Sequence, residues 1–192
     1  MSELSPGGRE TLLRLARASI QEAVRSDGAL PPLLERTTIA AELESPRGAF
    51  VTLRKPAEGG NNALRGCIGS VVAAKPLYRT VIELAPKAAL EDPRFPPLGA
   101  EELDGLQIEV SVLTPLSPLE RVDDLVLGRD GVQLKKGAVH AVFLPQVAKE
   151  HDWTVEQLLT NLARKAGLDQ SAWSSAELSV FQAEVFGDGV RP

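Results

Sequence analysis

The stretch Leu106-Gln107-Ile108-Glu109-Val110-Ser111-Val112 gives the clearest indication of the fold class, because apolar and polar residues alternate along it. Side chains of a β-strand point to opposite faces in turn, so this alternation predicts a strand with one buried face. Further runs of strand-forming residues lie at 49–54, 64–72, 132–135, 138–144 and 178–186. Turns separate some of these runs and helices separate others, without a regular βαβ alternation. The sequence therefore predicts an α+β protein with a largely antiparallel or mixed β-sheet flanked by helices.

The N-terminal part of the chain predicts a helix followed by a hairpin. Apolar residues recur at three- and four-residue spacing over about 9–26, and Gly28 can close that helix. An irregular stretch is expected from 31 to about 48. The first two strands should then pair as a hairpin, because the Gly- and Asn-rich segment 56–62 between them is typical of a turn.

Two more helices are predicted further along. Residues 77–90 carry an apolar face that Pro86 interrupts, so the helix should kink there or a second helix should start. Thr154 and Gln157 match a capping box that opens a helix to 166, which Gly167 can terminate.

Composition narrows the class of protein. The 192 residues are 43% hydrophobic and 24% charged, which fits one ordinary globular domain. The formal net charge of −5 argues against nucleic acid as a partner, because phosphate neutralisation needs clustered Lys and Arg. A single cysteine, an N-terminus without signal-peptide features and the lack of a long apolar run predict a cytoplasmic protein that does not enter a membrane.

Chemistry-bearing fingerprints are scarce. The chain has neither a Gly-rich phosphate loop nor a dinucleotide-binding motif, so no cofactor is indicated. With only His140, His151 and one cysteine, a zinc site is not expected.

The segment Leu64-Arg65-Gly66-Cys67-Ile68-Gly69 is the most informative part of the chain for function. Glycines inside a strand usually mark a bulge or the close approach of another group, so Gly66 and Gly69 are candidate substrate-binding positions. Strand alternation puts Arg65 and Cys67 on one face, roughly 6–7 Å apart. A guanidinium there favours the reactive thiolate, so both are candidate catalytic residues. Alternatively, Cys67 is a small buried hydrophobe and the glycines serve packing.

A second candidate cluster is Glu91-Asp92-Pro93-Arg94-Phe95, whose charges lie on a proline-stiffened backbone. In one interpretation it is a preorganised polar site, in which Asp92 or Glu91 handles protons and Arg94 helps to bind an anionic substrate. In the other, Asp92 caps a turn and forms a structural ion pair with Arg94.

These segments resemble the AMMECR domain family, also called AmmeMemoRadiSam system protein A. The hallmark of that family is the block at 64–69. The other matching pieces lie at 48–53, 92–98, 110–113, 143–148, 165–168 and 181–186. The chain departs from the family pattern at Pro86, where asparagine is usual, and near Ala163, where a cysteine often occurs.

The resemblance implies a single α+β domain over 1–192 with a small second lobe, and a shared pathway with Memo-like proteins and radical S-adenosylmethionine enzymes. Two hypotheses follow from the residues and the resemblance together. One is a cysteine-dependent enzyme that acts on a small anionic substrate through Cys67, Arg65 and Asp92. The other is a non-catalytic binding or accessory module that docks on those partners. The sequence favours the enzyme, because accessory domains seldom need a thiol framed by two glycines.

Overall fold

The computed structural model describes residues 3–25, 38–56 and 62–188, and the chain divides into two compact units. The first unit comprises Met1–Leu113 and Glu184–Pro192, and the second comprises Thr114–Ala183. The second is the smaller of the two. The single domain predicted over 1–192 stays a prediction, since this division describes contacts within the chain and not independent folding.

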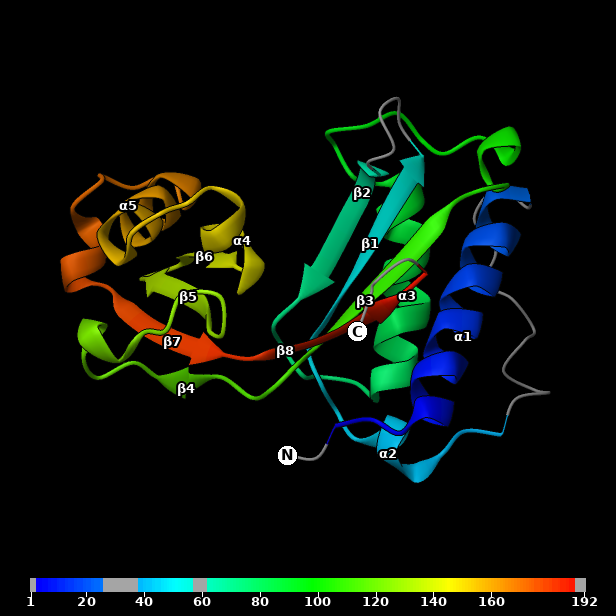
Figure 1. Ribbon diagram of the computed structural model, residues 1–192, viewed down its shortest axis with the longest axis horizontal. Coiled ribbons are helices and arrows are strands. Elements are labelled where there is room, and N and C mark those ends of the chain that lie inside the picture. Colours follow the sequence, from blue (N-terminus) through cyan, green and yellow to red (C-terminus); the bar gives the residue numbers. More distant parts are fainter. Residues whose placement is uncertain (1–2, 26–37, 57–61, 189–192) are drawn as a thin grey trace. The chain divides into compact units, whose positions relative to one another are not determined.

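In the first unit, helices cover one face of a four-stranded sheet (Figure 1). Its elements in chain order are α1 (Pro6–Arg25), α2 (Ala41–Glu44), β1 (Ala49–Pro56), β2 (Asn62–Ser70), α3 (Leu77–Leu90), η2 (Ala100–Glu102), β3 (Gln107–Leu113) and β8 (Ala183–Gly187). The strand order is β2-β1-β3-β8, and β1 runs antiparallel to both β2 and β3. Strand β2 therefore lies at one edge of the sheet.

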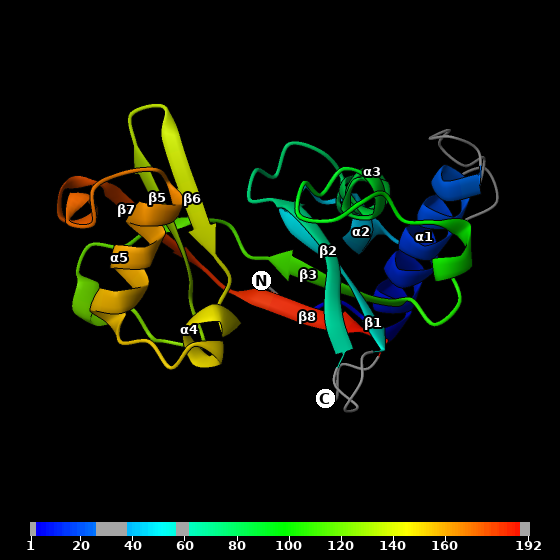
Figure 2. The ribbon, with the colours of Figure 1, turned by 90° about the horizontal axis from the view of Figure 1, so that it is seen from above.

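Strand alternation separates the two faces of this sheet. Val51, Leu53, Ile108 and Val110 are buried in one core with the apolar residues of α1 and α3. Figure 2 shows both helices on the same side of the strands. The residues between these positions in β1 and β3 consequently point to the face that α1 and α3 leave uncovered.

The second unit is built around another four-stranded sheet, of order β4-β7-β5-β6. Its elements are β4 (Ser117–Pro118), η3 (Val122–Asp124), β5 (Gly131–Lys136), β6 (Val139–Phe143), α4 (Gln146–Glu150), α5 (Val155–Lys165), η4 (Ala172–Ser175) and β7 (Glu177–Phe181). Its own core includes Leu134, Leu159 and Leu162. Together the two units confirm the predicted α+β class with antiparallel strands.

Several predicted elements are confirmed, with shifted ends. Helix α1 starts at Pro6 rather than 9, because the hydroxyl of Ser5 accepts a hydrogen bond from Gly8 N–H (3.0 Å) and caps the first turn. Residue 26, Gly28 and most of the turn segment 56–62 lie outside the described residues. The capping box of Thr154 and Gln157 is present at the start of α5.

Two predictions are wrong, and a third is decided in part. The stretch expected to be irregular up to 48 contains the short helix α2. Helix α3 continues through Pro86, so no second helix starts there, and the alternative of a kink stays a prediction. The strand predicted at 178–186 is divided at Gln182 into β7 and β8, which belong to different sheets. The Gln182 N–H donates instead to the hydroxyl of Thr114 (2.8 Å), and this bond marks the boundary between the two units.

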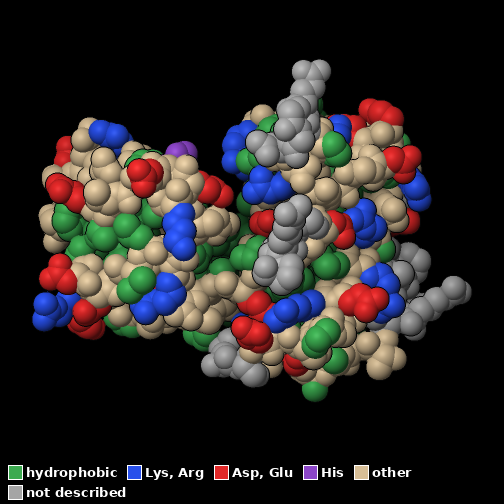
Figure 3. Space-filling model, viewed as in Figure 1, with side chains coloured by type: hydrophobic (Ala, Val, Ile, Leu, Met, Phe, Trp, Pro, Cys, Tyr) green, Lys and Arg blue, Asp and Glu red, His purple; other side chains and the backbone are tan. Residues whose placement is uncertain are grey.

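Two features of the described residues bear on partners. None of the described helices combines the length and apolar character that crossing a bilayer requires. On the face shown in Figure 3, basic and acidic side chains are interspersed rather than gathered by sign. That pattern does not provide the extended basic surface that nucleic-acid binding uses.

Candidate functional site

The two glycines of the hallmark segment lie where other groups approach the backbone, as predicted. A Cβ atom on Gly66 would lie 2.0 Å from the carbonyl oxygen of Ala88 in α3. One on Gly69 would lie 2.1 Å from the ring of Phe50. Any larger side chain would displace α3 or Phe50, so both glycines serve packing in this structure. Their predicted role in substrate binding stays a prediction.

A β-bulge at Arg65 changes the expected alternation. Gly66 pairs with Leu53 and Leu64 pairs with Arg54, so Arg65 has no partner residue in β1. An extra residue of this kind breaks the two-residue period of the strand. The prediction that Arg65 and Cys67 share a face therefore does not follow from the pairing that the structure shows.

The guanidinium of Arg65 is held by the segment that follows α3. Its Nε and Nη2 donate to the two carboxylate oxygens of Glu102 at 3.0 and 2.8 Å, and its Nη1 donates to Pro96 O at 2.9 Å. These bonds from Arg65, with a further one from Lys55, lower the pKa of Glu102 to about 2. Arg65 thus fastens β2 to the 96–102 segment, a geometry that disfavours its predicted role beside the thiol.

Asp92 anchors the same strand through a second set of hydrogen bonds. Its carboxylate accepts hydrogen bonds from Cys67 N–H (2.8 Å), from Arg94 Nη2 (2.6 Å) and from Arg94 Nε (2.9 Å). The side chain is almost fully buried, and the bonds from Arg94 hold the pKa of the carboxyl well below its usual range. A carboxylate that stays ionised cannot exchange protons near neutral pH, so this geometry disfavours the predicted proton transfer by Asp92. The structural ion pair with Arg94 is the interpretation that the contacts support.

Arg94, rather than Arg65, is the arginine beside the thiol. Its Nη2 donates to Cys67 O (3.4 Å), and its side chain is 53% exposed. The carboxylate of Asp92 raises the pKa of Arg94, and Cys67 acts in the same direction. Arg94 therefore presents positive charge to solvent next to Cys67, and its anion-binding role stays a prediction.

Cys67 lies in a row of polar side chains across three strands. The register places it opposite Thr52 in β1, and Thr52 opposite Glu109 in β3. The row is on the face that α1 and α3 leave uncovered, because the alternating neighbours of Thr52 and Glu109 are in the core. The hydroxyl of the buried Thr52 donates to the sulfur of the half-buried Cys67 at 3.2 Å. The register thus aligns a thiol, a hydroxyl and a carboxylate at neighbouring positions of three strands.

Comparison with known proteins identifies the family. The AMMECR1 family model matches residues 13–186. A protein of Thermococcus gammatolerans is 42% identical over 92% of this chain and 88% of its own, and one of Methanothermobacter thermautotrophicus is 40% identical over 95% of each. The chain belongs to the AMMECR1 family. The crystal structure of uncharacterized protein PH0010 from Pyrococcus horikoshii has a TM-score of 0.86 and 35% identity, covering 97% of this chain and 94% of that one.

The remaining predicted position of this AMMECR1-family site is Glu91, at the C-terminus of α3. Its N–H donates to Lys87 O (2.8 Å) and its side chain is exposed. The proton-handling role of the carboxylate stays a prediction. Within the described ranges, His, Cys, Asp and Glu side chains form no group of three that could hold a metal ion.

Sequence reasoning missed three residues of the site: Thr52, Glu102 and Glu109. The strand pattern already placed Thr52 and Glu109 between buried neighbours, but only the pairing register shows that they align with Cys67. Glu102 follows a proline-rich stretch and carried no signal in the sequence. The contact between Glu102 and Arg65 spans 37 residues and depends on the path of the intervening chain.

Proposed function

We propose that this AMMECR1-family protein is a cysteine-dependent enzyme that acts at Cys67 on a small anionic substrate. The hydrogen bond from the Thr52 hydroxyl to the Cys67 sulfur carries the proposal. The thiolate is the nucleophilic form of cysteine, and the Thr52 hydroxyl is placed to donate a hydrogen bond to its sulfur. The half-exposed guanidinium of Arg94 also suits an anionic group arriving from solvent.

In the step assigned to Cys67, the sulfur forms a bond to an electrophilic carbon of the substrate. The leaving group departs with the electron pair of the bond that breaks. Beforehand, the hydroxyl of Thr52 turns, gives its own proton to Glu109, the carboxylate in the same row, and takes up the thiol proton; it then donates to the thiolate. The register supports this route, because side chains directly opposite on neighbouring strands are within reach of each other. Asp92 only holds Arg94 and the backbone of Cys67.

Alkylation kinetics test the proposal, since the chain has one cysteine and intact mass reports its modification directly. The folded wild type should react with iodoacetamide at pH 7 at least tenfold faster than the urea-unfolded chain. Thr52→Val and Glu109→Gln should each slow the folded protein about fivefold or more. Thr160→Val, a matched substitution in the second unit, should not change the rate. A folded thiol that reacts no faster than the unfolded one contradicts the proposal.

The alternative function is a binding or accessory module, which the roles of Arg65 and Asp92 favour. Both residues were candidates for catalysis, and both are engaged in contacts that fix β2. Complementation of a strain lacking the protein separates the two functions. Cys67→Ser should abolish complementation if the thiol is a nucleophile and should preserve it if the chain only binds.

Memo-like and radical S-adenosylmethionine proteins are the partners that we propose from the family resemblance. An affinity pull-down from the source organism tests this association. Retention of either protein supports direct docking, and loss of both at low salt counts against it.

A further inference from the structure

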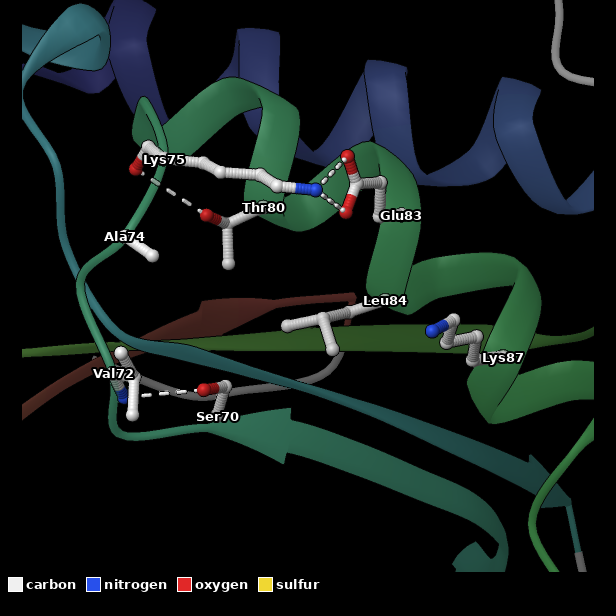
Figure 4. Close-up of a pocket in the computed structure, with 8 residues that line it drawn as sticks. All are labelled: Ser70, Val72, Ala74, Lys75, Thr80, Glu83, Leu84 and Lys87. Carbon is white, nitrogen blue, oxygen red and sulfur yellow. Dashed lines mark hydrogen bonds and ion pairs between the residues drawn. The ribbon is translucent and has the colours of Figure 1, made fainter.

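A cavity of about 300 Å³ lies in the first unit, between the end of β2, the connection after it and the first turns of α3. Figure 4 shows its lining residues converging from these three segments. This volume is at the lower end of the range for small-molecule pockets. Because every wall belongs to one unit, the cavity exists independently of how the two units are arranged.

The charges around the cavity leave one cation unpaired. Lys75 Nζ contacts both carboxylate oxygens of Glu83, at 2.7 and 2.8 Å. Glu83 and Lys87 are one turn apart on α3 and would ordinarily pair, but Glu83 is already occupied. Lys87 has no ion-pair partner among the described residues. In Figure 4 its amino group is turned toward Leu84, over the cavity.

Hydroxyl and apolar groups complete the lining. Ser70 Oγ accepts a hydrogen bond from Val72 N–H (3.1 Å), so its own O–H remains a donor. Leu84 is 8% exposed, whereas Val72 is 64% exposed and lies outside the core of this unit. The cavity thus combines a cation and a hydroxyl donor with apolar surface that water covers poorly.

We propose that this cavity binds a small organic monocarboxylate with a short branched apolar body. The carboxylate pairs with the ammonium of Lys87 and accepts from Ser70, and the body covers Leu84 and Val72. One unpaired cation suits one negative charge. The site differs from the one at Cys67, because α3 lies on the Gly66 side of β2 and the Cys67 side chain points to the other face.

Titration of the ¹⁵N-labelled full chain with 4-methylpentanoate, followed by NMR, tests this inference. Saturable shifts are expected at the amides of Ser70, Val72 and Lys87, and neutral 4-methylpentanamide should bind about tenfold more weakly. Lys87→Gln should weaken binding of the acid about tenfold, because it removes the cation and keeps the length of the side chain. The matched control Lys135→Gln, in the second unit, should bind like the wild type.

Three results each overturn the inference: equal affinity for acid and amide, an unchanged affinity in Lys87→Gln, or shifts confined to residues away from the cavity. Cys67→Ser should bind 4-methylpentanoate normally, so failure of this site and failure of the proposed thiol chemistry are distinguishable.

Discussion

Two stretches of β2 differ in what contacts their outer edge. At Arg65–Cys67, the Asp92 carboxylate and the Arg94 guanidinium take up the N–H and C=O of Cys67, and Glu102 holds Arg65. At Ile68–Ser70, Gly69 also directs its N–H and C=O away from β1, because backbone direction repeats every second residue of a strand. Among the strands that the structure describes, none lies beyond β2 on that side of the sheet, and the cavity beside α3 begins at Ser70.

The difference separates residues that build the site from residues that are open to a ligand. Charged residues of the hallmark segment and its surroundings mainly hold the edge strand in place. The groups left accessible are a thiol with its hydroxyl partner on one face and a cavity on the other. In a motif rich in reactive and charged residues, most of these residues can therefore serve to hold the strand in place, and only a few remain open to a ligand.

Replacing Gly66, whose backbone packs against α3, should have the largest effect on stability. Gly66→Ala places a Cβ against the Ala88 carbonyl, which is backbone and cannot move aside without shifting α3. We expect a loss of about 3 kcal/mol in the free energy of unfolding, measured by urea denaturation. Gly7→Ala is the control, since nothing lies within 4 Å of its Cβ position, and it should be neutral or stabilising. Equal stability of the two variants contradicts the account.

Removing the charge of Asp92 should have the next largest effect on stability. Asp92→Asn loses bonds to the guanidinium of Arg94, and we expect about 2 kcal/mol of destabilisation near neutral pH. The pKa of Asp92 is lower in the folded state than in the unfolded one. Its contribution is therefore complete well above the unfolded pKa of about 3.9 and shrinks as the pH falls below that value. Denaturation between pH 7 and 3 checks this, and a difference between the proteins that does not change with pH would be inconsistent with it.

Replacing Glu102 and replacing Glu83 should have smaller and unequal effects, because Glu102 belongs to an ion pair that is largely shielded from solvent and Glu83 to one that is exposed. Glu102→Gln should cost about 1.5 kcal/mol, because Glu102 and Arg65 are 19% and 12% exposed. Glu83→Gln should cost at most about 0.5 kcal/mol, because its pair with Lys75 is open to solvent. Urea denaturation of both variants measures the difference.

With the pKa of Glu102 at about 2, its contribution to stability should decline as the pH falls from about 4 toward 2. Equal costs for the two variants would contradict the difference between the shielded and the exposed ion pair.

Much of the fold could be predicted from local patterns. The strand around Ile108 and the helix after Thr154 followed from alternation and from a capping box, and both depend on neighbours in sequence. The break at Gln182 could not be predicted, because the residues on either side read as one strand. Only the pairing partners of β7 and β8 reveal that the chain passes from one sheet to another there.

The candidate site was predicted in position but not in detail. The glycines around Cys67 correctly indicated close approach, and the ion pair between Asp92 and Arg94 was one of two interpretations. The bulge at Arg65 adds one residue to a strand without changing its composition, so alternation alone cannot place Arg65 relative to Cys67. Thr52 became relevant only through the register, which depends on pairing across the sheet.

Hydrogen exchange at two amides of β2 tests the central comparison most directly. In the wild-type chain, the Cys67 N–H should be strongly protected by its bond to Asp92, whereas the Gly69 N–H should exchange close to the unfolded rate. In Asp92→Asn, the protection of Cys67 should fall by at least tenfold while Gly69 stays unchanged. Equal protection of the two amides in the wild type would contradict the account.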